Sequence, residues 1–201
     1  MMEKTQGQIL GVIFDLDGTL VRSNLEFDAI RDEIGIDNGP ILEAMADMDA
    51  SGRARAKAIL ARHEAEAAEN APLMPGAKDL LDGLTGQGLK IALMTRNSRQ
   101  SVETCTRRHD LRFDFIRTRD DGIAKPSPEP VLAVCRALAL TPTDCIHVGD
   151  HRFDVEAGNA AGCTTVLLRN PNANLNHVQP DYTIDTLSQI KSLTSPLHNN
   201  R

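Results

Sequence analysis

The chain has 201 residues, of which 41% are hydrophobic and 25% charged, a balance typical of a globular domain and not of a disordered or collagen-like chain. The formal charge is -6, and the only aromatic residues are five Phe and one Tyr. Basic patches and stacking rings are therefore scarce, which counts against nucleic acid as a ligand. No apolar run approaches the roughly 20 residues that span a bilayer, and no signal peptide precedes the first strand, so we expect a cytoplasmic protein without a membrane partner.

Short apolar runs recur along the chain and predict strands that are buried on both faces of a parallel sheet. They cover residues 9–14, 90–95, 113–118, 145–149, 164–168 and 181–184. Helical patterns lie between them, at about residues 76–86, 98–109, 127–139 and 155–161. Strands that alternate with helices predict a doubly wound α/β fold, in which ligands bind beyond the carboxyl ends of the strands.

Residues 21–74 interrupt this alternation, because they contain helical patterns at residues 25–34, 41–48 and 52–69 and no strong strand. We therefore predict an α/β core of residues 1–20 and 75–201, and a small α-helical insertion of residues 21–74 directly after the first strand and its loop. In the third helical pattern, alanines at helical spacing predict a stripe that packs on a neighbouring helix, namely Ala54, Ala58, Ala61, Ala65 and Ala68.

The acid excess belongs to this insertion, which holds 11 acidic and 6 basic residues, whereas the rest of the chain holds 17 and 16. One stretch of it, residues 51–62, is basic and includes Arg53, Arg55 and Lys57. Two interpretations stay open. These side chains bind a second anionic group of a ligand, or they form a solvated helix face that pairs with nearby glutamates.

An acid pair follows the first predicted strand. Asp15 and Asp17 are separated by one residue, and two carboxylates this close raise a pKa or recruit a cation. Gly18 comes next and allows a tight turn and a close approach of the backbone. A turn rich in Asp and Gly without any ligand is the alternative interpretation.

Three further strand ends carry polar residues. Thr95 and Arg96 follow the second apolar run, where a hydroxyl and backbone N–H groups at a helix start can hold an anion. Lys125 lies in a loop before Pro126, and Asp150 and Asp154 follow the run at residues 145–149. Taken one at a time, these features are also typical of helix caps and solvated loops.

The order of these features resembles the four motifs of the haloacid dehalogenase superfamily, a phosphatase-rich group of hydrolases with an aspartate nucleophile. DLDGTL at residues 15–20 resembles the first motif, Thr95 the second, Lys125 the third, and GDHRFD at residues 149–154 the fourth. The resemblance spans about residues 9 to 185 and is greatest to the branch of phosphoglycolate phosphatases and β-phosphoglucomutases. It implies that residues 21–74 form a short cap over the site.

The resemblance also implies an activity, that of a Mg²⁺-dependent phosphatase that hydrolyses the phosphate monoester of a small metabolite, with phosphoglycolate as one candidate. In that mechanism Asp15 is the nucleophile, and Asp17 is the general acid and base. The implied residues are Asp15, Asp17 and Lys125 for catalysis, Thr95, Arg96 and Lys125 for substrate binding, and Asp15, Asp17, Asp150 and Asp154 for the metal.

Two alternatives stay open, a phosphomutase of the β-phosphoglucomutase type and a non-catalytic binding protein on the same fold. Cleavage of carbon–halogen bonds is disfavoured, because dehalogenases of the superfamily lack an acid at the position of Asp17. The four cysteines are far apart in the sequence and form no CxxC motif, which predicts small buried hydrophobic residues and no zinc or redox site. The sequence predicts no particular oligomeric state.

Overall fold

The computed structural model describes residues 8–171 and 173–194, and one sheet of six parallel strands forms its centre. The strands lie in the order β3-β2-β1-β4-β5-β6, so the chain starts in the middle of the sheet and adds strands on both sides. Their bounds are β1 (Gly11–Phe14), β2 (Lys90–Met94), β3 (Phe115–Arg117), β4 (Cys145–Gly149), β5 (Thr164–Leu168) and β6 (Tyr182–Ile184). All six lie within the predicted runs, and the predicted α/β fold is confirmed.

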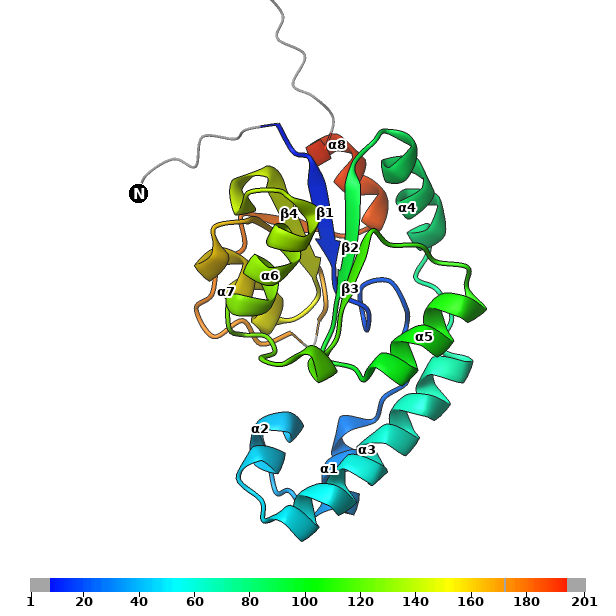
Figure 1. Cartoon of the computed structure of the whole chain (residues 1–201), viewed down its shortest axis with the longest axis vertical. Coiled ribbons are helices and arrows are strands. Elements are labelled where there is room, and N and C mark those ends of the chain that lie inside the picture. The colour runs from blue at the N-terminus through cyan, green and yellow to red at the C-terminus, as the bar shows by residue number, and fades with distance from the viewer. Residues whose placement is uncertain (1–7, 172, 195–201) are drawn as a thin grey trace, which may run out of the picture.

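Helices cover both faces of the sheet (Figure 1), with α6 and α7 on one face and α4, α5 and α8 on the other. Their bounds are α4 (Ala77–Gly86), α5 (Arg99–Arg108), α6 (Glu129–Leu138), α7 (Arg152–Ala161) and α8 (Ile190–Thr194), with short 3₁₀ turns η1 (Arg119–Asp121), η2 (Pro142–Asp144) and η3 (Leu187–Gln189). Side chains of β1 alternate between the faces, since Val12 and Phe14 pack toward α4 and α5 while Ile13 packs toward α6. Both faces are apolar because both are covered.

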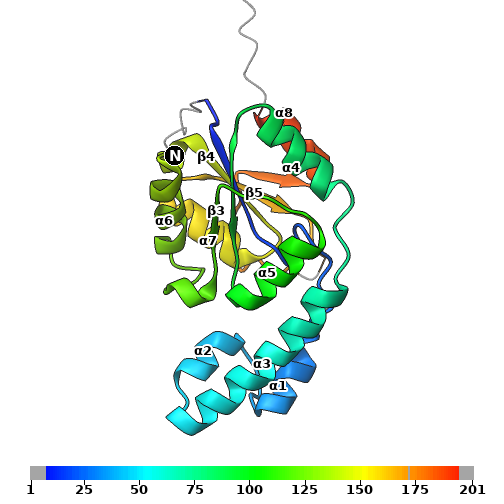
Figure 2. The same cartoon turned by 45° about the vertical axis from the view of Figure 1, so that its right-hand side comes forward.

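The insertion consists of three helices beyond the carboxyl ends of the strands, as Figure 2 shows. They are α1 (Phe27–Ile34), α2 (Ile41–Ala46) and α3 (Ala50–Asn70). Ile30, Ile41 and Leu60 form a separate apolar cluster between them. The other end of α3 belongs to the main core, where Ala68 packs in the same cluster as residues of α5. No helix in the described part of the chain is both long and apolar enough to cross a membrane.

The two chain segments that join the insertion to the sheet lie side by side. The backbone N–H of Arg22 donates to the carbonyl of Pro72 at 2.9 Å, and that of Met74 donates to the carbonyl of Leu20 at 2.9 Å. Val21 lies between these two bonds and pairs with Leu73 as an antiparallel bridge. We call residues 20–22 and 72–74 the neck.

The predicted alanine stripe on α3 is wrong. Three of its members, Ala54, Ala58 and Ala61, are exposed. The buried face of α3 instead contains Ala56, Leu60, Glu64 and Ala68. Alanine occurs on every side of this helix, so alanine spacing does not mark the packed side. The larger apolar residues and the contacts with α1, α2 and α5 decide it.

All four cysteines are buried free thiols, as small hydrophobic residues would be. The fold nevertheless brings two distant ones together, because Sγ of Cys135 on α6 lies 3.8 Å from Sγ of Cys145 on β4. The separation of these two cysteines in the sequence therefore did not indicate how close their thiols lie.

Two glycines inside helices give a matched test of packing. A Cβ on Gly158 of α7 would lie 2.5 Å from Cγ2 of Thr165 and 3.1 Å from Nδ1 of His147, whereas a Cβ on Gly83 of α4 would meet only the end of the Lys191 side chain at 3.8 Å. We expect Gly158→Ala to lower the free energy of unfolding by about 1–3 kcal/mol through overpacking. We expect Gly83→Ala to raise it by about 0.5–1 kcal/mol through helix propensity. Urea titration of both variants measures the difference, and equal effects would contradict this packing.

Candidate active site

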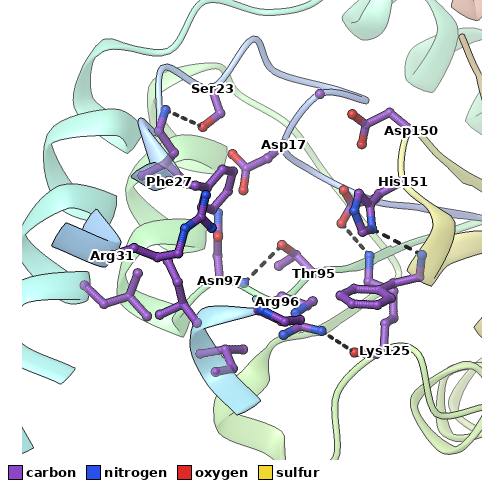
Figure 3. Close-up of a pocket in the computed structure, with 18 of the residues that line it drawn as sticks. Asp17, Ser23, Phe27, Arg31, Thr95, Arg96, Asn97, Lys125, Asp150 and His151 are labelled. Atoms are coloured by element: carbon purple, nitrogen blue, oxygen red, sulfur yellow. Dashed lines mark hydrogen bonds and ion pairs between the residues drawn. The ribbon is translucent and has the colours of Figure 1, made fainter. Parts of the chain in front are cut away.

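A cleft of about 1370 Å³ lies between the carboxyl ends of the strands and the insertion helices. Figure 3 shows its central residues, which come from strands, loops and helices that are far apart in the sequence. The structure brings all of the predicted site residues to the wall of this cleft, namely Asp15, Asp17, Thr95, Arg96, Lys125, Asp150 and Asp154.

Lys125 lies at the centre of the site. Its Nζ donates to Oδ1 of Asp15 at 2.6 Å, to Oδ1 of Asp154 at 2.6 Å and to the carbonyl of Met94 at 3.1 Å. Burial disfavours the charged ammonium, but the charges of the two carboxylates outweigh it and raise the pKa of Lys125 above its usual value. Lys125 is therefore a fixed cation.

Three carboxylates lie close enough to share one cation. One oxygen each of Asp15, Asp150 and Asp154 lies within 4.8 Å of the others. Burial raises the pKa of Asp15 well above its usual value, and burial together with the charge of Asp154 raises the pKa of Asp150 to about 7. Carboxylates crowded in this way are hard oxygen donors that fit a divalent cation such as Mg²⁺.

Asp154 differs from the other two acids in its partners. Its Oδ1 accepts from Lys125, and its Oδ2 accepts from the backbone N–H of His151 at 3.1 Å. Burial alone would raise its pKa, but the charge of Lys125 and these hydrogen bonds lower it. Because protein groups already use both oxygens, this geometry suits an orienting role or contact with a metal through water.

Two glycines make room for the acids. A Cβ on Gly18, whose φ is +75°, would lie 2.2 Å from Oδ2 of Asp150. A Cβ on Gly149 would lie 2.1 Å from Cγ of Asp154. Any larger residue at either position would push a carboxylate out of place.

Asp17 has different surroundings. Burial raises its pKa to about 6, although the side chains of Asn97 and Ser23 donate hydrogen bonds to its carboxylate and oppose this shift. Neither partner was among the predicted site residues. Asn97 could have been suspected, because it lies two residues after Thr95, whose Oγ1 accepts from the Asn97 backbone N–H at 3.2 Å. No sequence signal marks Ser23.

His147 of β4 is a further residue near the site that was not among the predicted site residues. It is buried behind the site, with Nε2 3.7 Å from Oδ1 of Asp154, and neither ring nitrogen has a hydrogen-bond partner in the described structure. Burial lowers its pKa to about 4, so the ring is neutral near pH 7 and adds no second cation beside Lys125.

The basic stretch of α3 does not reach the cleft, because none of Arg53, Arg55 and Lys57 lines it. Arg53 instead donates to the carbonyls of Ala46 and Met48 at 2.9 and 2.8 Å, at the end of α2. Arg55 donates to the carbonyl of Ile34 at 3.1 Å, at the end of α1. These arginines satisfy carbonyls that the short helices leave free. Arg53 and Arg55 thus have backbone partners within the insertion, and Lys57 is exposed outside the lining of the cleft.

Comparison with known proteins gives consistent matches. The family model of haloacid dehalogenase-like hydrolases matches residues 9–162. The uncharacterized hydrolase YOR131C of Saccharomyces cerevisiae is 34% identical and covers 96% of both chains. A phosphoglycolate phosphatase of Chromobacterium violaceum is 27% identical, over 92% of this chain and 96% of its own. The crystal structure of a hydrolase from Pseudomonas syringae shares the fold with a TM-score of 0.80 at 21% identity, over 92% of this chain and 100% of its own.

Metal binding by the crowded carboxylates can be tested without an activity measurement. At pH 8, above its raised pKa, Asp150 is ionised, and its buried charge beside Asp154 lowers the free energy of unfolding of the metal-free protein. We expect Asp150→Asn to be more stable than the unmodified protein without metal by about 0.5–2 kcal/mol, which corresponds to about 2–4 °C in Tm per kcal/mol. Added Mg²⁺ should raise the Tm of the unmodified protein and leave that of the variant unchanged. Equal Mg²⁺ shifts in both proteins would exclude Asp150 as a ligand.

Arg53 gives a second test, in which stability and substrate binding separate. Because its guanidinium satisfies carbonyls at the end of α2, we expect Arg53→Ala to cost about 1 kcal/mol of stability and to leave KM unchanged. Lys57→Ala, at an exposed position of the same helix, is the control and should change neither quantity. A rise in KM for Arg53→Ala without loss of stability would restore the ligand-binding interpretation.

Proposed function

The chain belongs to the haloacid dehalogenase-like hydrolases, as a member related to their phosphatases, and we propose that it is a Mg²⁺-dependent phosphatase that forms a phosphoryl intermediate on Asp15. One observation carries the proposal. The ammonium of Lys125 lies 2.6 Å from carboxylates of Asp15 and Asp154. Its charge opposes the burial that raises the pKa of Asp15, and so favours the anionic form of the nucleophile. That arrangement lets one anion approach another.

In the first step, an oxygen of Asp15 attacks phosphorus, and the bond between phosphorus and the ester oxygen breaks. Asp17 donates its proton to the departing oxygen, and its pKa of about 6 supports this role because the protonated form is accessible near neutral pH. The charge of Lys125 would neutralise the phosphoryl group, and the hydroxyl of Thr95 would donate to a phosphoryl oxygen, with Arg96 beside them.

In the second step, Asp17 accepts a proton from water, and the water oxygen attacks the phosphorus of the phosphorylated Asp15. The acyl phosphate bond breaks, inorganic phosphate leaves, and the Asp15 carboxylate is restored. The hydrogen bonds from Ser23 and Asn97 would keep Asp17 pointed at the same reacting oxygen in both steps.

The donor set supports magnesium as the cation. Side-chain oxygens of Asp15 and Asp150 and the backbone carbonyl of Asp17 would hold it, with Asp154 orienting the site. When bound, Mg²⁺ would neutralise negative charge on the phosphoryl group.

We also propose that residues 21–74 act as a cap over the site. Residues of α1 and α2, including Phe27, Arg31 and Ile41, form the wall of the cleft opposite the acids. A wall of this kind limits the access of water and contacts the organic part of a small phosphorylated metabolite. A relative is named phosphoglycolate phosphatase, so phosphoglycolate is one of the esters to test first.

The mechanism predicts that Asp15 is indispensable. We expect Asp15→Asn to lower the turnover of p-nitrophenyl phosphate by at least about 1000-fold, and omission of Mg²⁺ to lower it comparably. Asp82→Asn, at an exposed position of α4, is the matched control and should keep full activity. Turnover that survives in Asp15→Asn would overturn the mechanism. Measuring inorganic phosphate also separates hydrolysis from phosphoryl transfer to a sugar.

A further inference from the structure

Every arginine that lines the cleft has an acidic partner. In the described structure each of the four lies within 4.0 Å of a carboxylate, in the pairs Arg31–Asp28, Arg96–Glu43, Arg119–Glu64 and Arg152–Glu156. Lys125 is the remaining cation of the lining, and two carboxylates already contact it. The part of the cleft beyond the phosphoryl site therefore offers no uncompensated positive charge to a second anion.

Arg96 is the arginine that matters most, since it directly follows Thr95. Groups of the core hold its guanidinium in place, because Nη1 donates to the carbonyl of Lys125 at 2.6 Å and Cζ lies 4.7 Å from the centre of the Phe153 ring. Its other nitrogen, Nη2, donates to both carboxylate oxygens of Glu43 at 2.6 and 2.9 Å. Arg96 thus belongs to the core, and its counter-ion comes from α2 of the insertion.

This pairing has a consequence for the leaving group of the substrate. A carboxylate or phosphate there would have to compete with Glu43 for Nη2, and the displaced Glu43 would then lie beside it as a like charge. A hydroxyl meets no such repulsion, because it is uncharged and can accept from the remaining N–H groups of Arg96 or donate to nearby oxygens.

We propose that Glu43, acting through Arg96, makes this protein select phosphate esters whose leaving group carries hydroxyls and no second anion. Glu43 is a positioning and specificity-determining residue, since it does not itself line the cleft. The proposal rests on the proposed phosphatase function, and it ranks phosphoglycolate as a poor substrate.

The test compares two esters that differ in one terminal group, glycerol 3-phosphate with a hydroxymethyl group and 3-phosphoglycerate with a carboxylate. For the unmodified protein we expect kcat/KM to be at least about tenfold higher for glycerol 3-phosphate, the discrimination that one charged contact supplies. In Glu43→Gln we expect kcat/KM for 3-phosphoglycerate to rise about tenfold through a lower KM, with kcat and the glycerol 3-phosphate values little changed.

Two further variants separate this role from a general effect of charge or stability. Glu33→Gln removes a carboxylate of α1 that pairs with Arg62 at 2.6 Å, outside the cleft, and should leave the ratio of the two esters unchanged. Adding Arg96→Gln to Glu43→Gln should abolish the rise in kcat/KM for 3-phosphoglycerate relative to glycerol 3-phosphate. In the double variant no guanidinium remains to bind the carboxylate.

The outcomes are distinct. A higher kcat/KM of the unmodified protein for 3-phosphoglycerate overturns the proposal. An unchanged ratio in Glu43→Gln, or an equal change in Glu33→Gln, overturns it as well. In these cases turnover of p-nitrophenyl phosphate shows that the phosphatase function itself stands. If the unmodified protein hydrolyses none of the three esters with Mg²⁺, the phosphatase function fails, and the selectivity fails with it.

Discussion

The buried ammonium of Lys125 is the charge on which the site depends. It lies between two carboxylates that would otherwise repel each other in a poorly solvated cleft. Its three acceptors lie beyond or at the carboxyl ends of neighbouring strands. Met94 ends β2, Asp15 directly follows β1, and Asp154 lies in the first turn of α7, which follows β4. The strand order β2-β1-β4 thus sets the spacing of the charges, and the parallel sheet is the reason that residues up to 110 positions apart meet at one cation.

Local patterns in the sequence predicted the sheet, and the resemblance to a family predicted which residues form the site. Each apolar run ends in a polar residue, and parallel strands bring those ends to one edge. Parallel pairing therefore predicts that Asp15, Thr95 and Asp150 lie together, and all three line the same cleft. The division at residues 21 and 74 and the individual catalytic roles stay predictions. Helix α8, with five residues, is too short to show a helical period.

The errors have a common cause, namely that they concern partners chosen by tertiary contact. Alanine occurs on every side of α3, so alanine spacing did not reveal that Leu60 and Glu64 lie on the buried side. The guanidinium of Arg53 could satisfy an anion or a free carbonyl, and only the position of the end of α2 decides between them. The side chain of Ser23 donates a hydrogen bond to Asp17. No residue pattern in the sequence predicts this contact.

The acid excess of the insertion acquires a structural meaning from these contacts. Glu64 is buried and pairs with Arg119 of the core, while one of its oxygens accepts from the backbone N–H of Ser98 at 3.3 Å. Glu43 and Arg96 form the second connection of this kind. Acids of the insertion therefore face arginines of the core across the cleft.

The neck has a consequence for how such a protein can change over evolutionary time. Because residues 20–22 and 72–74 are hydrogen-bonded side by side, the ends of the inserted segment are already close together within the sheet domain. The entropic cost of closing a loop grows only slowly with its length, so a longer or shorter segment could begin and end at the same two points with little effect on the sheet. Under the proposed function, the insertion can therefore change in length while the residues at the strand ends that would break the phosphate ester stay in place.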